Sequence, residues 1–465
     1  MHVWKYATLA SAAGLALCAA AQQQPSRPPA ESAPAQAPAP RRFVNDICLP
    51  SNLYMLSDAQ NDVFVQPFIK RWRPYDDFVR FSIKGRKKDA FMRRLSHVAT
   101  IDKPVDGTVL DVDLVNGDEF ETVKRLSPKI RVGRRGVGDK DVYVQIIGDS
   151  LTHGRFFQTA LLEQGHVPKL HMTGLLKFAE GQYNEGRGGW ALATYFSVPQ
   201  SPNRSYHGFM HPEGGRYWGN RDFWKMAWRC FRKTQPPGFE PSYSCARFDD
   251  CVPRFDENTG VLLDPKEGDV QFDEASKSFV RYDGSAWKAV PAKSLKWSFD
   301  YGKYLEMWGV KPPQILFVSL GVNDFRSNLH ADFSQWGRNI TTMKESYLKA
   351  CPGGKFVIAI PISTCGSVDN MAGDFNPYFN AAMWNFRNWL IKTFDGREKE
   401  GFYLLDAGIA TDNDYGFVLA NGPAAVPFAG YAGKEKLRIQ TGNPHPYPNY
   451  CTMGIPFAAF IQYHR

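Results

Sequence analysis

Several signatures that would place the chain in a well-marked class are missing. No internal stretch approaches the roughly 18 consecutive apolar residues of a membrane-spanning helix, and collagen-like or sustained heptad repeats are absent. These absences argue against a polytopic membrane protein and a fibrous protein. Cysteine is scarce, with 8 among 465 residues. None has the C-x-x-C or histidine spacing of a zinc site, so we expect no metal and no cofactor.

The chain also has only a small excess of positive charge for its length. The formal net charge of +9 is spread over 465 residues, and the densest basic clusters, residues 84–88 and Arg93-Arg94, are short. A solvated basic face is the simpler interpretation, although such a surface would favour anionic substrates. No zinc-finger spacing, RNP motif or long basic helix is present, so we expect no nucleic-acid partner. The 43% hydrophobic content is ample for packed cores, and the length fits two domains or one elaborated domain.

Residues 1–21 have the composition of a secretory signal peptide. Lys5 precedes a run of small and apolar residues that ends in three alanines, the small-residue pattern of a cleavage site. Residues 22–42 are rich in Pro, Ala and Gln, which predicts a linker without a packed core. We therefore expect a secreted, periplasmic or cell-surface protein with no transmembrane segment in the mature chain. Lipoprotein anchoring at Cys18 is the weaker alternative, because Leu17 fits poorly before it.

The remaining cysteines fall in a chain that we expect to be exported. An exported protein meets an oxidising compartment, in which disulfides form. Cys230, Cys245 and Cys251 are close in sequence, and we expect one disulfide among them. The pairing of the other cysteines is left open.

The chain divides into an all-β part and an α/β part. Residues 43–140 contain short runs rich in β-branched and aromatic residues, separated by Asp/Asn/Gly turns, which predicts a small β-sandwich accessory domain. From residue 141 onward, buried-type strands alternate with helices, which predicts a flavodoxin-like three-layer α/β/α domain over 141–465. The expected strands are 142–147, 314–320, 355–361 and 402–406, and the expected helices are 156–164, 297–308, 331–349 and 376–394. Residues 197–295, rich in Trp, Tyr and Gly, interrupt this pattern as an insertion with a strand–turn–strand segment over 270–290.

Four polar clusters lie where a predicted strand ends or a loop begins. They are residues 148–152, 185–190, 321–324 and 443–446. Taken alone, Ser150 is explained as a helix cap, Gly188-Gly189 as a tight turn, Asn323 as a loop residue and His445 as a packed surface histidine. Together they fit a catalytic site, because open α/β sheets bind ligands outside the carboxyl ends of their strands.

In these clusters the sequence resembles the GDSL-type SGNH serine hydrolases. Gly148-Asp149-Ser150, Gly321-Val-Asn323-Asp324 and His445-Pro446 match three of the family's blocks, and Gly189, with Gly188 as its rival, matches the glycine block less sharply. The resemblance covers residues 142–196 and 297–465, and it extends to secreted bacterial members with an N-terminal β-sandwich.

The resemblance implies a role for each matched residue. Ser150 would be the nucleophile and His445 the base that takes its proton, while the Ser150 and Gly189 N–H groups and the Asn323 side chain would form the oxyanion hole. The family's Asp three residues before the His is replaced here by Gly442. Asn443, a backbone carbonyl, or a carboxylate at Asp406, Asp412 or Asp414 would then orient the imidazole, or a Ser–His dyad would operate.

The leading hypothesis is a secreted serine esterase that hydrolyses acyl esters, acetyl foremost, on an acylated glycan or another small ester. One alternative is a lipid or thioester acylhydrolase on the same machinery. The alternative of another class is a non-catalytic glycan-binding protein, for which Gly442 is the best evidence. Aromatic residues of the insertion are candidates either for sugar-stacking surfaces or for its own core: Tyr217, Trp218, Trp224, Trp228 and Trp287. The oligomeric state is left open.

Overall fold

The computed structural model describes most of the chain after its first 44 residues. The described residues are 45–71, 77–84, 92–94, 97–117, 119–153, 156–234, 248–362, 377–412, 419–422, 437–440, 445–446 and 450–465. The chain forms two units, Met1–Val44 and Asn45–Arg465, and the second contains all of the described residues. The predicted signal peptide and linker therefore lie outside the described residues. Within the described ranges, no helix is long and apolar enough to span a bilayer.

The region before residue 134 consists of short strands. They are β1 (Asn52–Leu56), β2 (Asn61–Phe64), β3 (Asp77–Ile83), β4 (Met92–Arg94), β5 (Val98–Ile101), β6 (Leu110–Asn116), β7 (Thr122–Leu126) and β8 (Lys129–Gly133). β3-β6-β7 and β2-β5-β4 are antiparallel sheets, and β1 pairs with β8 in parallel. Alternating apolar residues such as Phe81, Val112 and Leu114 form a buried core of this region. The predicted short strands are present; that they form an independent sandwich domain stays a prediction.

These strands are docked on the C-terminal helices α7 (Pro377–Phe394) and α8 (Tyr450–His464). Trp384 of α7 donates its indole N–H to the Phe68 carbonyl at 2.9 Å. A Cβ on Gly133 of β8 would lie 2.3 Å from the Ala459 carbonyl oxygen of α8. Glycine at position 133 therefore permits the close approach of strand and helix.

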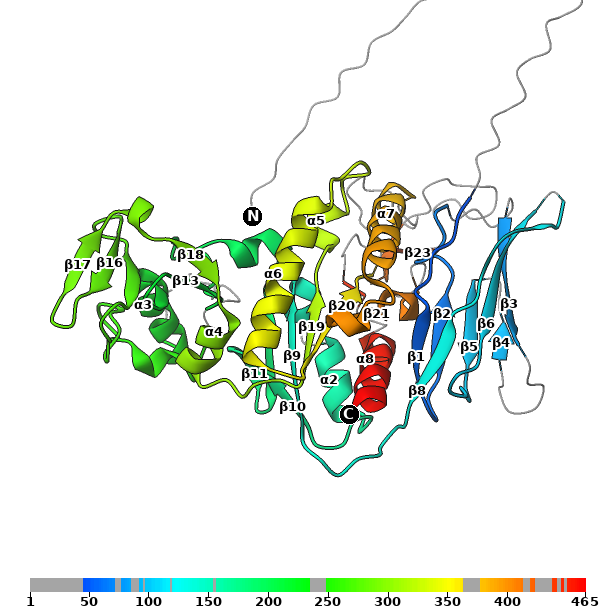
Figure 1. Cartoon of the computed structure of the whole chain (residues 1–465), viewed down its shortest axis with the longest axis horizontal. Helices are drawn as coiled ribbons and strands as arrows, with labels where there is room; N and C mark the ends of the chain where they lie inside the picture. Colours follow the sequence, from blue (N-terminus) through cyan, green and yellow to red (C-terminus); the bar gives the residue numbers. More distant parts are fainter. Residues whose placement is uncertain are drawn as a thin grey trace, which may run out of the picture. The chain divides into compact units, whose positions relative to one another are not determined.

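The second region is built on a sheet whose main strands are parallel (Figure 1). β9 (Val142–Gly148), β19 (Ile315–Ser319), β20 (Lys355–Ile360) and β21 (Phe402–Asp406) lie side by side in this order. β10 (Leu170–Thr173) and β12 (Gln182–Gly186) pair in parallel with β9 on its other side, and β11 (Leu176–Ala179) is antiparallel to β12. The four buried strands expected from their apolar runs are all present, because each run fills a strand that is covered by other elements.

Helices pack on both faces of this sheet. They include α2 (Phe156–Glu163), α4 (Tyr301–Trp308) and α6 (Ser334–Ala350). Gln145 of β9 donates its side-chain N–H to the Tyr304 hydroxyl of α4 at 2.9 Å. Phe317 of β19 is in register with Ile146, the next residue of β9, and its ring lies 4.9 Å from that of Phe457 in α8. Since successive residues of a strand face opposite sides, α4 and α8 cover opposite faces of this mixed α/β fold.

One helix prediction needs correction, and one helix is not among those expected. Residues 297–308 do not form one helix: β18 (Trp297–Phe299) comes first, and Asp300 caps α4 by accepting a hydrogen bond from the Lys303 N–H at 2.9 Å. The helix not expected is α8, over residues 450–464. Pro456 stands inside α8, and proline in a helix interior normally argues against a helix. Burial of the apolar side chains of α8 outweighs this local preference.

The insertion has its own strands and helix. They are β13 (Met210–Pro212), β14 (Tyr217–Asn220), α3 (Arg221–Phe231), β15 (Val270–Asp273), β16 (Ser278–Tyr282) and β17 (Trp287–Val290). The expected strand–turn–strand segment over 270–290 contains three strands, in a sheet ordered β14-β15-β16-β17. Tyr217, Trp218 and Trp224 are 1%, 3% and 0% exposed. They form core rather than sugar-stacking surfaces, whereas Trp228 and Trp287 are half-buried.

The remaining elements are short. They are α1 (Ser150–His153), α5 (Val322–Phe325), β22 (Leu419–Gly422), β23 (Leu437–Gln440) and the 3-10 turns Leu192–Phe196, Val252–Arg254, Ala292–Ser294, Glu398–Glu400 and Gly408–Ala410. One disulfide is expected among Cys230, Cys245 and Cys251. Cys245 lies outside the described residues, and Cys251 is a buried free thiol.

Candidate active site

Ser150 stands at the carboxyl edge of the sheet, directly after β9. A Cβ on Gly148 would lie 2.0 Å from the Thr152 hydroxyl oxygen, so the strand ends in a glycine where the first turn of α1 folds back. The buried Asp149 carboxylate accepts a hydrogen bond from the Leu151 N–H at 2.9 Å. Burial raises the pKa of Asp149 to about 7. Ser150 itself is half-buried, and its hydroxyl has no hydrogen-bond partner among the described residues.

The glycine turn lies beside Ser150. β12 runs parallel to β9 with Gly186 opposite Gly148, so the segment after Gly186 leaves the sheet at the same edge. A Cβ on Gly188 would lie 4.0 Å from the Ser150 Cβ. Gly189 has a φ of +75°, a left-handed conformation that favours glycine. Both glycine candidates are thus in the turn next to Ser150, and the backbone of Gly189 is the one that requires glycine.

A buried ion pair between Glu185 and Arg187 precedes this turn and holds its backbone. The Arg187 guanidinium donates to the Glu185 carboxylate at 2.7 Å and to the Tyr206 carbonyl at 3.0 and 2.7 Å. The other Glu185 oxygen accepts from the Tyr304 hydroxyl at 2.5 Å. Burial acts to lower the pKa of Arg187, but the interactions with Glu185 and Tyr195 together outweigh it, so the net direction is upward. The pair fixes the chain on either side of Gly186.

The role of this ion pair is the main feature that sequence reasoning misses. Glu185 and Arg187 belong to one of the four polar clusters, but the spacing gives them no function. Their partners Tyr206 and Tyr304 come from distant segments. The only sequence signal for the ion pair is an acidic and a basic residue two positions apart, next to a glycine pair. This signal does not identify the Tyr206 carbonyl and the Tyr304 hydroxyl that complete their hydrogen bonds.

The third cluster is tied to the end of the glycine turn. Gly321, with a φ of +129°, leads into α5, and a Cβ there would lie 2.2 Å from the Phe386 ring. The Asn323 side-chain N–H donates to the Trp190 carbonyl at 3.1 Å. Asp324 accepts from the Leu192 N–H at 3.0 Å. An amide nitrogen has two N–H donors, so Asn323 can hold the turn with one and retain the second for a substrate oxygen.

Asp324 shares the buried environment of Asp149. Burial raises the pKa of the Asp324 carboxyl to about 6, and its charge also acts to raise the pKa of Asp149. Ser319, at the end of β19, is in register with Gly148 of β9. The clusters that contain Ser150 and Asn323 therefore follow adjacent parallel strands.

His445 is the described residue of the fourth cluster together with Pro446. Burial, and secondarily the charge of Arg326, lowers its pKa below 6.5. The charge of Arg326 also acts on Asp149. A lowered pKa keeps the imidazole neutral at pH 7, the form that accepts a proton. Gly442 and Asn443 lie outside the described residues.

The carboxylate candidates for orienting His445 differ in their surroundings. Asp406 forms a buried ion pair with Arg387 of α7. Burial raises the pKa of Asp406, and Arg387 opposes this shift. Asp414 lies outside the described residues. The ion pair with Arg387 gives Asp406 a partner of its own, which weakens its candidacy as the imidazole partner. Throughout the described part of the chain, no group of three or more His, Cys, Asp or Glu side chains has an arrangement that could hold a metal ion.

Comparisons with known proteins give only distant similarities. No protein-family model and no curated protein matches the sequence. Similar solved structures include a carbohydrate esterase family 3 protein from Talaromyces cellulolyticus (11% identity, 68% of this chain, 94% of that chain, TM-score 0.29). Others are an acetyl esterase mutant with an acetate ion (11%, 68%, 93%, 0.28) and a possible lipase from Chitinophaga pinensis (9%, 68%, 96%, 0.30). At these TM-scores the functional conclusion depends on the residues of the site itself.

Proposed function

We propose that the protein is a secreted serine esterase of the SGNH type, which hydrolyses acyl esters, acetyl foremost, on a carbohydrate. One observation carries the proposal: the Ser150 turn, the Gly188-Gly189 turn and the Asn323 segment lie at one sheet edge and contact one another. Helices on both faces of a parallel sheet support the finer assignment to a flavodoxin-like three-layer domain. The predicted leader and linker support export and hence an extracellular, glycan-borne ester.

In the proposed reaction, Ser150 Oγ attacks the ester carbonyl carbon while His445 takes the hydroxyl proton. The carbonyl oxygen becomes negative, and the N–H groups of Ser150 and Gly189 with the free N–H of Asn323 stabilise it. The tetrahedral intermediate collapses, and His445 returns the proton to the departing sugar alcohol. Water then attacks the acyl-Ser150 ester with His445 again as base, which releases the carboxylic acid and restores the serine.

The environment of these groups fits this sequence of steps. Serine hydroxyls are inert nucleophiles until a base removes the proton, and a His445 with a lowered pKa is neutral and able to act at pH 7. The exposed glycine turn leaves space above the backbone N–H groups, since no atom of the described residues lies within 4 Å of a Cβ placed on Gly189. An acyl group can therefore approach Ser150 from this side.

The test is hydrolysis of p-nitrophenyl acetate by the purified protein. We expect Ser150→Ala to abolish turnover while the circular dichroism spectrum and the thermal midpoint stay unchanged. Ser294→Ala, at an exposed serine of the insertion, is the matched control and should behave like the wild type. Wild-type turnover in Ser150→Ala would overturn the nucleophile assignment. A folded wild-type protein that does not hydrolyse any of a panel of acetylated glycans or aryl acetates would favour the non-catalytic alternative.

A further inference from the structure

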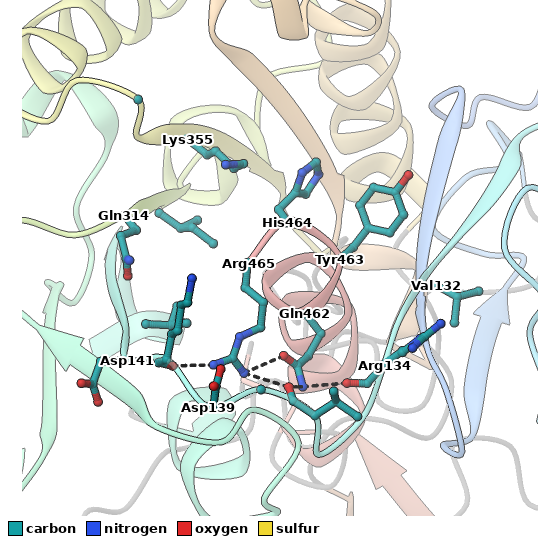
Figure 2. Close-up of a pocket in the computed structure, with 16 residues that line it drawn as sticks. Val132, Arg134, Asp139, Asp141, Gln314, Lys355, Gln462, Tyr463, His464 and Arg465 are labelled. Atoms are coloured by element: carbon teal, nitrogen blue, oxygen red, sulfur yellow. Dashed lines mark hydrogen bonds between the residues drawn. The ribbon is translucent and has the colours of Figure 1, made fainter.

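A second cavity lies at the opposite edge of the sheet from Ser150. It has a volume of about 680 Å³ and lies at the amino ends of β9, β19 and β20, against the end of α8 (Figure 2). The chain that connects β8 to β9, residues 134–141, forms one wall. Cavities of roughly 300–1,000 Å³ are the size that binds small organic molecules.

Three backbone carbonyls at this cavity, those of Arg134, Val137 and Lys140, already accept hydrogen bonds from protein side chains. Gln462 donates to the carbonyls of Arg134 and Val137 at 2.7 and 3.0 Å. The Arg465 guanidinium donates to the Val137 carbonyl at 2.9 Å and to the Lys140 carbonyl at 2.5 Å. These contacts, drawn in Figure 2, fix the wall of the cavity. The side chains, rather than the main chain, are therefore left to contact a ligand.

The cations that line the cavity are not neutralised by protein groups. Arg134, Lys140 and Lys355 have no ion-pair partner among the described residues, and all three line the cavity. Of the two lining carboxylates, Asp141 is paired with His171 at 2.8 Å, which leaves Asp139. Positive charge is thus in excess among the side chains that line the cavity.

Lys355 is the best placed of these cations. It is half-buried at the first position of β20 and shares one side of the cavity with His464 (Figure 2). Burial, followed by the charge of Lys355, lowers the pKa of His464 to about 4. His464 is therefore neutral at pH 7, so it adds no positive charge beside Lys355 that would repel the lysine.

The same cavity offers apolar surface to the body of a ligand. Val132, Val137 and Ile315 line it. Val137 is 54% exposed, one of the few large apolar side chains with this much exposure. Burial of an exposed apolar side chain against a ligand is favourable, at about 25 cal/mol per Å² removed from water.

We propose that this cavity binds a small organic anion, with its carboxylate or phosphate on Lys355 and the neighbouring cations and its apolar body against Val132, Val137 and Ile315. The site is separate from the proposed esterase site and requires no chemistry at Ser150. Because the ligand would contact the β8–β9 connection, β20 and α8 together, its binding stabilises the folded chain.

The experiment is isothermal titration calorimetry of the full chain with benzoate and phenyl phosphate, which share an apolar ring and differ in the acidic group. Benzamide is the uncharged control, and inorganic phosphate is the control without an apolar body. We expect at least one of the two organic anions to bind and raise the thermal midpoint. Binding of benzoate alone assigns the head group as a carboxylate, and binding of phenyl phosphate alone assigns it as a phosphate.

Two variants connect the binding to the cavity. Lys355→Gln should weaken binding by about tenfold, the effect of losing one charge-assisted hydrogen bond, and Val137→Ser should weaken binding of the aromatic anions but not of inorganic phosphate. Lys293→Gln, at an exposed lysine of the insertion, is the control and should bind as the wild type does. Three results would overturn the proposal. Benzamide could bind as tightly as the anions, or a folded Lys355→Gln protein could bind as tightly as the wild type. The third is that neither organic anion binds at about 10 mM, roughly 100 times the protein concentration.

Discussion

The two edges of the central sheet differ in what their polar side chains bond to. At the carboxyl edge, Asn323 and Asp324 each hydrogen-bond the backbone of a neighbouring segment, and Asp149 bonds the backbone of its own turn. At the amino edge, Lys355 and Lys140 have no such protein partner among the described residues. Polar side chains at the first edge hold loops in place, whereas these two lysines at the second edge remain free for a ligand.

This difference shows how the proposed nucleophile, Ser150, can stand on short, glycine-rich loops. Surface loops open readily where few contacts hold them. Here the buried pair Glu185–Arg187 and the contacts of Asn323 and Asp324 tie the loops to one another. The Ser150 turn, the glycine turn and α5 therefore form one positioned unit. Breaking these ties should have large effects, and changes at exposed ion pairs should have small ones.

The largest effect on stability is expected for Arg187→Met. This change leaves the Glu185 carboxylate buried without its cation, and breaking a buried ion pair in this way costs about 3–5 kcal/mol. The free energy of unfolding should fall by this amount in urea titrations, and p-nitrophenyl acetate turnover should fall with it. Arg187→Lys should recover part of both, since lysine keeps the charge but loses the bonds to the Tyr206 carbonyl.

The exposed pair Lys277–Glu274 in the insertion provides the control for Arg187. Exposed ion pairs contribute little because water and salt screen them. Lys277→Met should leave both the urea midpoint and turnover unchanged within error. Equal losses in Arg187→Met and Lys277→Met would contradict the view that burial gives the first pair its importance.

Asn323→Ala should reduce catalysis more than stability. An oxyanion-hole donor typically contributes about 10²–10³ in turnover, or about 2.7–4 kcal/mol. The lost bond to the Trp190 carbonyl at 3.1 Å is a single neutral hydrogen bond, worth roughly 1 kcal/mol. Stopped-flow turnover beside urea unfolding separates the two. A loss of folding without a fall in turnover per folded molecule would show that Asn323 is only a loop tie.

The parts of the fold that the sequence predicts are those governed by local apolar runs. β9, β19, β20 and β21 are each a short apolar run next to a glycine, a proline or a polar residue, and this pattern is enough to locate them. The start of α4 is misplaced because Trp297-Ser-Phe299 fits either a strand or a helix, and its pairing with β13 decides. α8 is missed because Pro456 argues locally against the helix that tertiary packing stabilises.

In the candidate site, too, some features follow from the local sequence and others from tertiary packing. The positions of Ser150 and Asn323 follow from the strands that precede them, since adjacent parallel strands end at one edge. The positive φ of Gly189 is consistent with its glycine. By contrast, the Glu185–Arg187 pair depends on Tyr206 and Tyr304, which come from other segments, and the pairing of Asp406 with Arg387 depends on where α7 crosses β21. Such contacts are set by packing and have no local sequence signal.

Stability should depend on pH through Asp149. Its folded-state pKa is raised from 3.8 to about 7 by burial, so the folded protein retains the proton while the unfolded chain loses it near pH 4. The contribution is fully present below about pH 4 and is lost as the pH rises to about 7. Asp149→Asn should remove this loss and make the variant more stable than wild type at pH 8, by on the order of 2 kcal/mol.

The measurement for Asp149 is a series of urea titrations from pH 4 to pH 8 on both proteins. Asn keeps an oxygen that can accept from the Leu151 N–H, so the first turn of α1 is preserved. Asp324→Asn is the companion variant. It should remove the fall in the free energy of unfolding over a narrower pH range, because the Asp324 pKa is about 6. A wild-type stability that rises steadily between pH 4 and pH 7, with no change in Asp149→Asn, would contradict the raised pKa.

A small stability effect is expected at Gly189. Its φ of +75° is costly for any residue with a Cβ, by about 1–2 kcal/mol, although the space around it is open. Gly189→Ala should therefore lower the free energy of unfolding by this amount or shift the turn to a normal φ. A shift would move the Gly189 N–H away from the oxyanion, so turnover should fall at least tenfold while KM changes little.

Gly188→Ala is the matched control. Gly188 has no positive φ, and among the described residues its added Cβ would meet only the Ser150 Cβ, at 4.0 Å. It should cost little stability and retain most activity. If Gly188→Ala loses turnover and Gly189→Ala keeps it, the oxyanion donor belongs to Gly188, and the two residues exchange roles in the proposed mechanism.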